Sequence, residues 1–315
     1  MANIKWSYMD HYSMPGPRGN TSPYASRALA DEFVRTISGL GFQGFDSFAR
    51  YLPGRAAMFG SVKNYLDFLK ERGMEKIVGV FHEYSYVSPT RAPHVRATHD
   101  NIFRDVENIM RINDAGWGWE MMITMPASTY WQVEPVTDEK LRAMADIWNR
   151  VGKLTIANGI KTACHHEFWC GLKTVDEMEK FYNWTDPQYV YYYCDTAQHQ
   201  LAGNDPVKLY MKYHDRCCGF HLKDTHVQDT TEDFRMPPDP EAQAPHHTRW
   251  FWPMGEPAIP PYGPGLVDFP ALFKALKDYN YKGWVSVEHD GTSDYPESTC
   301  TAAWYIDNVL KKIYS

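Results

Sequence analysis

Apolar and polar positions follow two alternating patterns along the chain. Short apolar runs of strand length are each followed by a longer segment whose apolar residues recur every three or four positions, as on one face of a helix. Eight such strands and eight helices predict an α/β fold, a single (β/α)8 TIM barrel over residues 1–315. A doubly wound open sheet is the alternative, but it does not require eight units. The predicted strands are 3–8, 44–48, 76–82, 120–126, 162–168, 190–196, 217–223 and 283–290. The predicted helices are 24–39, 60–72, 99–114, 138–157, 174–183, 205–214, 268–279 and 295–313.

A glycine-rich stretch at Gly39, Gly41 and Gly44 matches the spacing of a dinucleotide-binding loop. That loop follows a strand and opens a helix. Here a predicted helix precedes the glycines and a predicted strand follows them. We therefore interpret the glycines as a helix end and a tight turn, and we predict no nicotinamide site.

One connection, residues 225–265, is far longer than the others. It follows the seventh predicted strand, on the face of the barrel where TIM-barrel enzymes carry their active sites. A loop of this length is usually a lid, a binding loop or a disordered segment. The segment is rich in proline but also contains Trp250, Phe251 and Trp252. Because disordered tracts are poor in aromatic residues, we predict a packed lid.

Four residues that can bind a metal stand at the C-terminal ends of the last four predicted strands: Glu167, Asp195, His221 and Glu288. Their separations of 28, 26 and 67 residues correspond to one βα unit, a second unit, and a unit plus the long insertion. Since successive barrel strands are neighbours, these side chains can converge. Three carboxylates and one imidazole favour Mn²⁺ or Mg²⁺ over zinc. Helix caps or salt bridges are the alternative for each residue taken alone.

Strand alternation places further titratable residues beside these four. If Glu167 points into the barrel, so does His165, and Lys223 accompanies His221. His165 and Lys223 are therefore candidates for proton transfer, with a core position as the alternative for His165. Candidates for substrate contact lie at the rim or at other strand ends, with capping or core packing as their alternative: His166, His199, Glu256, Asp46 and His82.

Charge and composition narrow the partners and the location. The chain has 32 Lys and Arg against 39 Asp and Glu, a net charge of −7, and no basic run, so no nucleic-acid partner is expected. No stretch approaches the roughly 20 apolar residues of a membrane span, and the N-terminus lacks the pattern of a secretory signal. The six cysteines form no CxxC pair. We therefore expect a cytoplasmic protein with free thiols and no membrane partner.

The second half of the chain resembles a known superfamily. The run YYYCDTAQHQLAGNDPVKLYMKYHDRCCGFHLKD is similar to the sixth-to-seventh strand signature of xylose isomerase-like barrels, and LVDFPALFKALKDYNYKGWVSVEHD is similar to their last helix and strand. The first four predicted strands share with this superfamily only the alternation of strands and helices. The resemblance implies an enzyme related to inosose dehydratases, ketose 3-epimerases and sugar isomerases. It also implies metal ligation by Glu167, Asp195, His221 and Glu288.

Two motifs, HHEFWC and HHTRWFWPMGEP, resemble the large subunit of bacterial C-glycoside deglycosidases. This resemblance implies a Mn²⁺-dependent lyase that cleaves the C–C glycosidic bond of 3-oxo-C-glucosides, in a hetero-oligomer with a small beta subunit. The alternative is an inosose dehydratase, or a ketose isomerase or epimerase, acting on a keto-polyol or small sugar. A catalytically silent sugar-binding barrel is a third hypothesis.

The chemistry implied by the resemblance begins with removal of a proton next to a ketone and ends with expulsion of the aglycone. His165 is assigned the role of base, and Lys223 or His289 assists the oxyanion or protonates the leaving group. Aromatic residues make up 15% of the chain and offer a flat slot for a planar aglycone, with core or subunit interface as the alternative. The tryptophans considered for this slot are Trp117, Trp119, Trp131, Trp169, Trp250 and Trp252.

Overall fold

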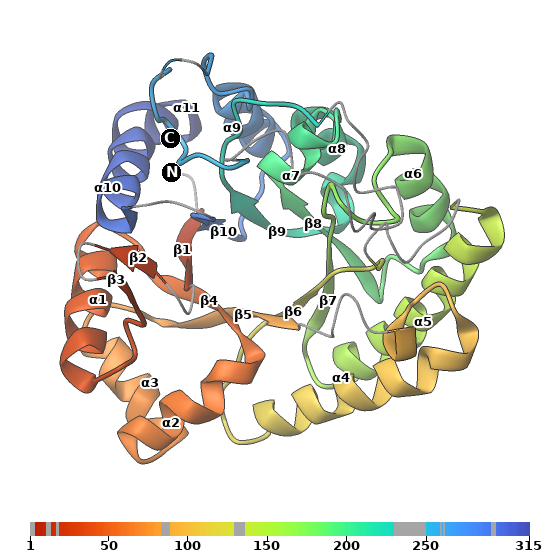
Figure 1. The fold of residues 1–315 in the computed structure, drawn as a ribbon, viewed down its shortest axis with the longest axis horizontal. Helices are drawn as coiled ribbons and strands as arrows, with labels where there is room; N and C mark the ends of the chain where they lie inside the picture. Colours follow the sequence, from red (N-terminus) through yellow and green to blue (C-terminus); the bar gives the residue numbers. More distant parts are fainter. Residues whose placement is uncertain are drawn as a thin grey trace, which may run out of the picture.

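Eight parallel strands close into a barrel at the centre of the molecule (Figure 1). The structure is a computed structural model that describes residues 4–10, 14–16, 19–82, 89–128, 136–229, 250–258, 260, 262–290 and 294–315. Each strand pairs with the next along the barrel, and β10 closes the ring against β1. The predicted TIM barrel is confirmed. Its strands are β1 (Lys5–Asp10), β4 (Gly44–Phe48), β5 (Lys76–His82), β6 (Met121–Thr124), β7 (Lys161–His165), β8 (Val190–Asp195), β9 (Cys217–Leu222) and β10 (Trp284–Val287).

Helices surround the barrel, and each predicted helix has a counterpart (Figure 1). Their apolar faces pack on the strands, because a strand of a parallel barrel is buried on both faces. The helices are α1 (Arg27–Gly39), α3 (Val62–Lys70), α4 (His99–Asn113), α5 (Asp138–Ala157), α6 (Val175–Trp184), α8 (Pro206–Tyr213), α9 (Phe269–Asp278) and α10 (Tyr295–Tyr305), which continues through a π-helical turn (Ile306–Leu310) into α11 (Lys311–Tyr314).

Two short helices and a small hairpin are among the elements that were not predicted. Helix α2 (Leu52–Phe59) follows β4, helix α7 (Thr196–Leu201) follows β8, and a small hairpin, β2 (Met14–Gly16) and β3 (Gly19–Thr21), follows β1. All of them come directly after a barrel strand. They therefore belong to the face of the barrel at the C-terminal strand ends.

Local sequence signals fix where several helices begin. Thr137 caps α5 by accepting a hydrogen bond from the Lys140 N–H at 3.3 Å. Asp268 caps α9 in the same way, through the Ala271 N–H at 2.9 Å. These side chains satisfy N–H groups that have no partner within the helix.

The glycine-rich stretch connects α1 to β4, as predicted. Helix α1 ends at Gly39 and β4 begins at Gly44. Gly41 has a φ of 95°, a left-handed conformation that glycine adopts without strain. A Cβ at Gly44 would meet Val78 Cγ2 at 2.6 Å, so glycine also permits close packing of the strand.

The barrel and its helices share one large apolar core, which includes two of the tryptophans considered for a ligand slot. Trp117 and Trp119 are each 3% exposed and pack in this core, so their core interpretation is confirmed. Trp131 lies outside the described residues. Among the described tryptophans, the slot hypothesis keeps Trp169, Trp250 and Trp252, and for Trp131 it stays a prediction.

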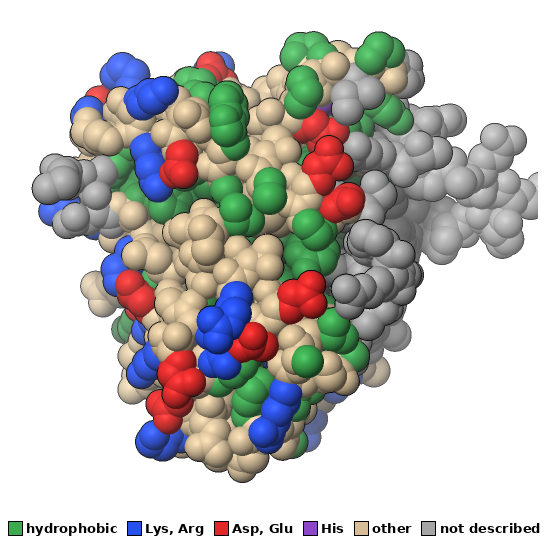
Figure 2. Space-filling model, turned by 90° about the vertical axis from the view of Figure 1, so that its left-hand side faces the viewer, with side chains coloured by type: hydrophobic (Ala, Val, Ile, Leu, Met, Phe, Trp, Pro, Cys, Tyr) green, Lys and Arg blue, Asp and Glu red, His purple; other side chains and the backbone are tan. Residues whose placement is uncertain are grey.

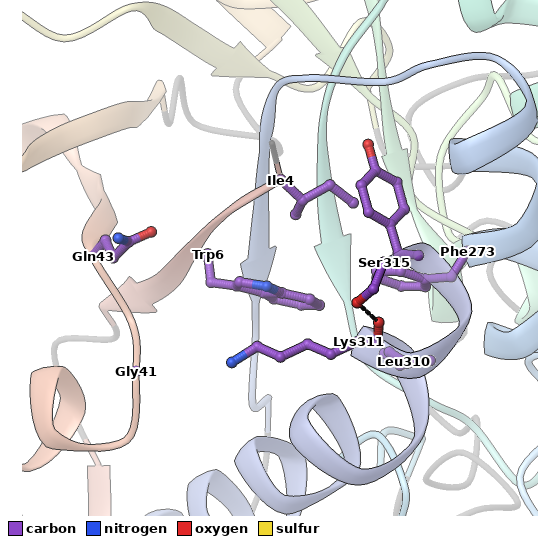
Figure 3. A pocket seen from close by; sticks show the side chains of 9 residues that line it. Ile4, Trp6, Gly41, Gln43, Phe273, Leu310, Lys311 and Ser315 are labelled. Atoms are coloured by element: carbon purple, nitrogen blue, oxygen red, sulfur yellow. Dashed lines mark hydrogen bonds between the residues drawn. The ribbon is translucent and has the colours of Figure 1, made fainter. Parts of the chain in front are cut away.

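A hollow of about 330 Å³ lies at the opposite end of the barrel from the C-terminal strand ends (Figure 3). It is lined by Ile4 and Trp6 at the start of β1 and by Gln43 before β4. The Trp6 ring stacks on Phe273 with centroids 5.5 Å apart and an angle of 6°. Because its lining holds no cluster of titratable side chains, the hollow offers no site for the predicted chemistry.

The outer surface carries both signs of charge. On the face shown in Figure 2, Lys and Arg side chains lie among Asp and Glu side chains without a continuous basic field. Helix α10 exposes a large apolar side chain, Trp304, at 61%. Among the described residues, no helix is both long and apolar enough to cross a membrane.

Candidate metal centre

Four buried side chains converge at the C-terminal ends of β7, β8, β9 and β10. His165 and Asp195 are the last residues of their strands, His221 is the penultimate residue of β9, and Glu288 directly follows β10. One potential ligand atom from each lies within 4.8 Å of all the others. This convergence arises because neighbouring parallel strands end at the same level of the barrel.

His165 occupies the position predicted for Glu167. Strand β7 ends at His165, so strand alternation does not extend to Glu167, which lies in the following turn. The Glu167 Oε1 atom is 3.1 Å from His165 Nδ1 and stands behind the imidazole, outside the group of four. The structure therefore brings Asp195, His221 and Glu288 together as predicted, with His165 as the fourth member.

Asp195 serves two roles at once. Its Oδ1 atom accepts the Gln198 N–H at 2.9 Å and caps α7. Its Oδ2 atom faces the barrel interior, 3.0 Å from His165 Nε2 and 2.8 Å from Lys223 Nζ. The capping and ligand interpretations of this residue are therefore compatible, because each uses a different oxygen.

The local field around the two imidazoles is strongly negative. Burial alone would lower the pKa of His165, but the carboxylates of Glu167 and Asp195 raise it to about 9. Burial likewise opposes charge on His221, while Glu288 and Asp46 raise its pKa to about 10. A site that raises imidazole pKa values in this way also attracts a metal cation.

The donor set fits a divalent ion. Both ring nitrogens of His221 and Oε2 of Glu167 are buried without a hydrogen bond to any described residue. His221 Nδ1 lies only 3.2 Å from Glu288 Oε2, so the two groups point at a common space. Two imidazoles and two carboxylates suit Mn²⁺, Fe²⁺ or Zn²⁺ better than Mg²⁺. The structure thus groups two imidazoles with two carboxylates, and the predicted set with Glu167 as a ligand in place of His165 stays a prediction.

Lys223 is buried against the same cluster. Its ammonium contacts Glu288, lies 2.8 Å from Asp195 Oδ2 and lies 2.7 Å from Asp290 Oδ2. Burial opposes the charge, but Asp195 and Asp290 hold the pKa of Lys223 well above its usual value. Lys223 is therefore held in its protonated, positively charged form.

Asp46 lies inside the barrel, beneath His221. Its Oδ1 accepts the Gly79 N–H at 2.8 Å, and its Oδ2 accepts the Tyr193 hydroxyl at 2.8 Å and lies 3.5 Å from His221 Nε2. At 1% exposure it orients an imidazole and is not placed to bind a sugar hydroxyl. His82 ends β5 at 3% exposure, and burial lowers its pKa to about 4, so this imidazole is neutral.

His166 and His199 lie away from the barrel mouth. His166 Nε2 is 2.7 Å from the Tyr182 hydroxyl, and His199 Nε2 is 2.9 Å from the Tyr192 hydroxyl. Both imidazoles belong to a buried aromatic cluster, in which His166 packs against Tyr182 of α6 and His199 packs against Tyr192 of β8. The structure therefore favours the core alternative over substrate contact.

The remaining predicted residues lie around the centre at greater distance. His289 alternates away from Glu288, and its ring lies 5.7 Å from the Tyr8 ring. Trp252 stacks on His226 with centroids 4.7 Å apart, and Glu256 stands on the half-exposed turn after it. None of these three belongs to the group of four.

A compact aromatic wall borders Lys223. We use this name for Phe168, Trp169, Trp250 and Phe251, which come from the β7–α6 loop and from the insertion. The Phe168 ring lies 4.9 Å from Trp169 and 5.1 Å from Trp250, and the Phe251 ring lies 4.8 Å from Lys223 Nζ. Trp169 and Trp250 were predicted to contact substrate. Phe168 and Phe251 were missed, because nothing in the sequence distinguishes them from core phenylalanines.

The structure thus combines a closed parallel barrel with a buried cluster of histidine and carboxylate side chains at the C-terminal strand ends. Residues 34–304 match the model of the family described as xylose isomerase-like TIM barrel. The chain therefore belongs to the xylose isomerase-like TIM barrel family.

Individual relatives agree with this assignment. The chain is 30% identical over 151 residues to an inosose dehydratase of Clostridium beijerinckii, over 48% of this chain and 47% of the relative. It thus spans about half the length of the curated relatives it matches. A probable 3-DHS dehydratase of Bacillus anthracis superposes with a TM-score of 0.69 at 13% identity, over 97% of this chain and 100% of that one. The structure of IOLI protein with a bound zinc atom superposes with a TM-score of 0.66 at 14% identity, over 99% of this chain and 100% of that one. At these identities, the structural likeness shows the fold alone.

Proposed function

We propose that the protein is a metal-dependent lyase that eliminates water from a keto-polyol of the inosose type. The observation that carries this proposal is the buried cluster of His165, Asp195, His221 and Glu288 with the Lys223 ammonium against it. The similarity to inosose dehydratases supports the substrate class. Mn²⁺ is the ion we expect, since it accepts both the imidazoles and the carboxylates.

The four residues would hold the ion, which when bound would polarise the substrate ketone as a Lewis acid. Glu167 is placed to act as the base, because its Oε2 atom is free of hydrogen bonds to the described residues. Burial raises the pKa of Glu167, which brings it closer to neutral pH. This role replaces the one first assigned to His165, whose nitrogens face Asp195 and Glu167.

In the proposed elimination, Glu167 takes the proton from the carbon next to the ketone. The electron pair forms the new C=C bond as the C–O bond to the hydroxyl on the following carbon breaks. Lys223 donates a proton to the departing hydroxide, which leaves as water. Afterwards the proton returns from Glu167 to Lys223 through solvent, and the net reaction is a dehydration.

The test is a dehydration assay with an inosose, followed by ultraviolet absorbance of the conjugated product. Turnover should require added Mn²⁺ and should stop with EDTA. Glu167→Gln should lower kcat by at least about 100-fold with the metal still bound, the size expected for loss of a general base. His221→Ala should instead abolish metal binding. Unchanged turnover in both variants would contradict the site assignment.

The aromatic wall favours a second candidate, cleavage of 3-oxo-C-glucosides. Trp169 and Trp250 are partly exposed beside the centre, and a flat aglycone can stack on such rings, whereas a polyol has no apolar face of that size. The chemistry starts in the same way and differs only in the group expelled. Aglycone release from a 3-oxo-C-glucoside and from its O-linked counterpart, each with and without EDTA, distinguishes this candidate from the first.

The same assay also tests the isomerase or epimerase alternative. Interconversion of ketose epimers without loss of water would identify such an enzyme.

The small beta subunit and the cytoplasmic location remain predictions. Co-expression with the small subunit, and comparison of aglycone release with and without it, tests whether a partner is required.

A further inference from the structure

The long insertion leaves and re-enters the barrel at a single point. We call this point the neck and define it as Asp224–Thr225, Trp252 and Gly265–Val267. Asp224 and Trp252 exchange two backbone hydrogen bonds of 2.8 and 2.9 Å, and the Leu266 N–H donates to the Thr225 carbonyl at 2.8 Å. The neck therefore joins the start of the insertion both to its end, near Leu266, and to Trp252 within it.

One carboxylate secures the neck. Asp224 Oδ1 accepts the Thr225 N–H at 2.8 Å and the Val267 N–H at 3.1 Å. At Gly265, an added Cβ would fall well inside van der Waals distance of Asp224 Oδ2. Only glycine permits so close an approach, so the carboxylate and the returning chain are fitted to each other.

The neck lies next to the residue that covers Lys223. Phe251 directly precedes Trp252, and its ring centroid lies 4.8 Å from Lys223 Nζ. Carboxylates surround the same ammonium, and Lys223 is only 1% exposed. Phe251 is therefore the apolar cover of a group of ion pairs whose strength depends on the exclusion of water.

We propose that Asp224 is a positioning residue that seats Phe251 over Lys223 by holding the neck closed. Phe251 and Trp252, which belong to the described part of the insertion, are then part of the active site, although none of the four candidate ligands identified among the described residues comes from the insertion. This inference concerns the barrel and its insertion, and its test does not depend on which substrate the protein converts.

The first test measures how accessible Lys223 is. The full chain receives a short pulse of reductive methylation with formaldehyde and cyanoborohydride, and peptide mass spectrometry gives the labelling of each lysine. In the parent protein, Lys208, whose side chain is 83% exposed, should react and Lys223 should not. In Asp224→Ala we expect labelling of Lys223 to rise on the order of tenfold, as local opening of the neck exposes it.

Internal controls separate opening of the neck from unfolding. Lys173 is 3% exposed and pairs at 3.0 Å with Asp229, which lies in the insertion but outside the neck. It should stay protected in Asp224→Ala. Asp268→Ala removes the cap of α9 one residue beyond the neck and should leave Lys223 protected. Labelling of Lys223 to the same extent in both variants would overturn the proposal.

A double-mutant cycle asks whether Asp224 acts through Phe251. Phe251→Leu should expose Lys223 directly, with the neck intact. If the two residues act in series, adding Asp224→Ala to Phe251→Leu should produce little further labelling. Additive effects would mean that Asp224 has only a general structural role, because independent sites add.

Two further variants decide the matter if Asp224→Ala loses its fold, which simultaneous labelling of Lys173 and Lys223 would reveal. Gly265→Ala should open the neck from its other side and label Lys223 selectively. Asp224→Asn keeps the Oδ1 acceptor and should retain most of the protection. Lys223 that stays protected in Gly265→Ala, while the Trp252 and Leu266 amides exchange faster with deuterium, would overturn the proposal.

Discussion

At the scale of single residues, the candidate centre depends on side chains that never reach it. Asp46 holds His221 from below and is itself held by the Gly79 N–H and the Tyr193 hydroxyl. A Cβ at Gly79 would lie 2.9 Å from Asp46 Oδ1, so this arrangement requires glycine at that position. Such supporting contacts fix the orientation of a metal ligand.

Asp46→Asn should weaken Mn²⁺ binding by about 10- to 100-fold, because it removes the negative charge beside His221 Nε2. Isothermal titration of the metal-free protein with Mn²⁺ measures the change. The matched control is Asp31→Asn, which removes a surface ion pair with Arg72 and should leave the affinity unchanged. Equal affinities in both variants would show that Asp46 does not support the ligand.

A second buried charge pair supports the opposite side of the barrel mouth. Arg55 Nη1 pairs with Asp10 and donates to Ser47 Oγ at 2.7 Å, and both charged side chains are at most 2% exposed. Arg55→Met should therefore lower the free energy of unfolding by about 3–5 kcal/mol, because the Asp10 charge stays buried without its counterion. Urea unfolding checks this value. Lys63→Met, which breaks an exposed pair with Asp67, should cost no more than about 1 kcal/mol.

At the scale of elements, the residue at which each strand ends determines which side chains reach the candidate metal centre. The alternating pattern predicted all eight strands, but it extended the fifth to residue 168, whereas β7 ends at His165. The exact end depends on hydrogen bonding to β6 and β8, which no local pattern contains. This three-residue difference places His165 at the strand end, where the pattern predicted Glu167.

Two helix glycines should respond oppositely to alanine. Gly152 of α5 packs against Tyr189, and a Cβ there would fall well inside van der Waals distance of the Tyr189 carbonyl oxygen. Gly54 of α2 has no atom within 4 Å of that position. Gly54→Ala should raise the free energy of unfolding by about 0.5–1 kcal/mol through helix propensity, whereas Gly152→Ala should lower it. Thermal unfolding of the two variants compares them, and a stabilised Gly152→Ala would contradict the packing described.

The neck should make stability depend on pH. Burial raises the pKa of Asp224 to about 6, above its usual value of 3.8. The folded state therefore binds this proton more tightly than the unfolded state, so its contribution to stability is present at low pH and is lost as pH rises through 6. As the pH is lowered from 7 to 5, the free energy of unfolding of the parent protein should increase relative to that of Asp224→Asn. Urea unfolding at each pH measures this difference. A constant difference would contradict the shift.

At the scale of the whole molecule, the fold was more predictable than the site. The strand pattern and the helix pattern repeat eight times along the sequence. The barrel prediction therefore depends on all eight units together and not on any single strand or helix. The position of His166 beside His199 and the cover of Lys223 by Phe251 depend on contacts between residues 33 and 28 positions apart. Apolar patterning carries no information about such contacts.

Metal binding should stabilise the entire barrel, since the four candidate ligands come from four neighbouring strands. At a free Mn²⁺ concentration about 100 times Kd, the gain should be about 2.7 kcal/mol, seen as a rise in the thermal midpoint. His221→Ala should remove this dependence on Mn²⁺. A midpoint that rises equally in the parent and in His221→Ala would place the ion elsewhere.

The neck also has a consequence for how such a protein can change over time. Because the insertion departs and returns where Thr225 and Leu266 are hydrogen-bonded to each other, the chain between them can change in length while its two ends keep their places on the barrel. A segment of this kind can be shortened, lengthened or exchanged with that of another barrel without altering a single strand. Substrate preference can therefore diverge by replacing one modular segment, while the chemistry at the strand ends is inherited unchanged.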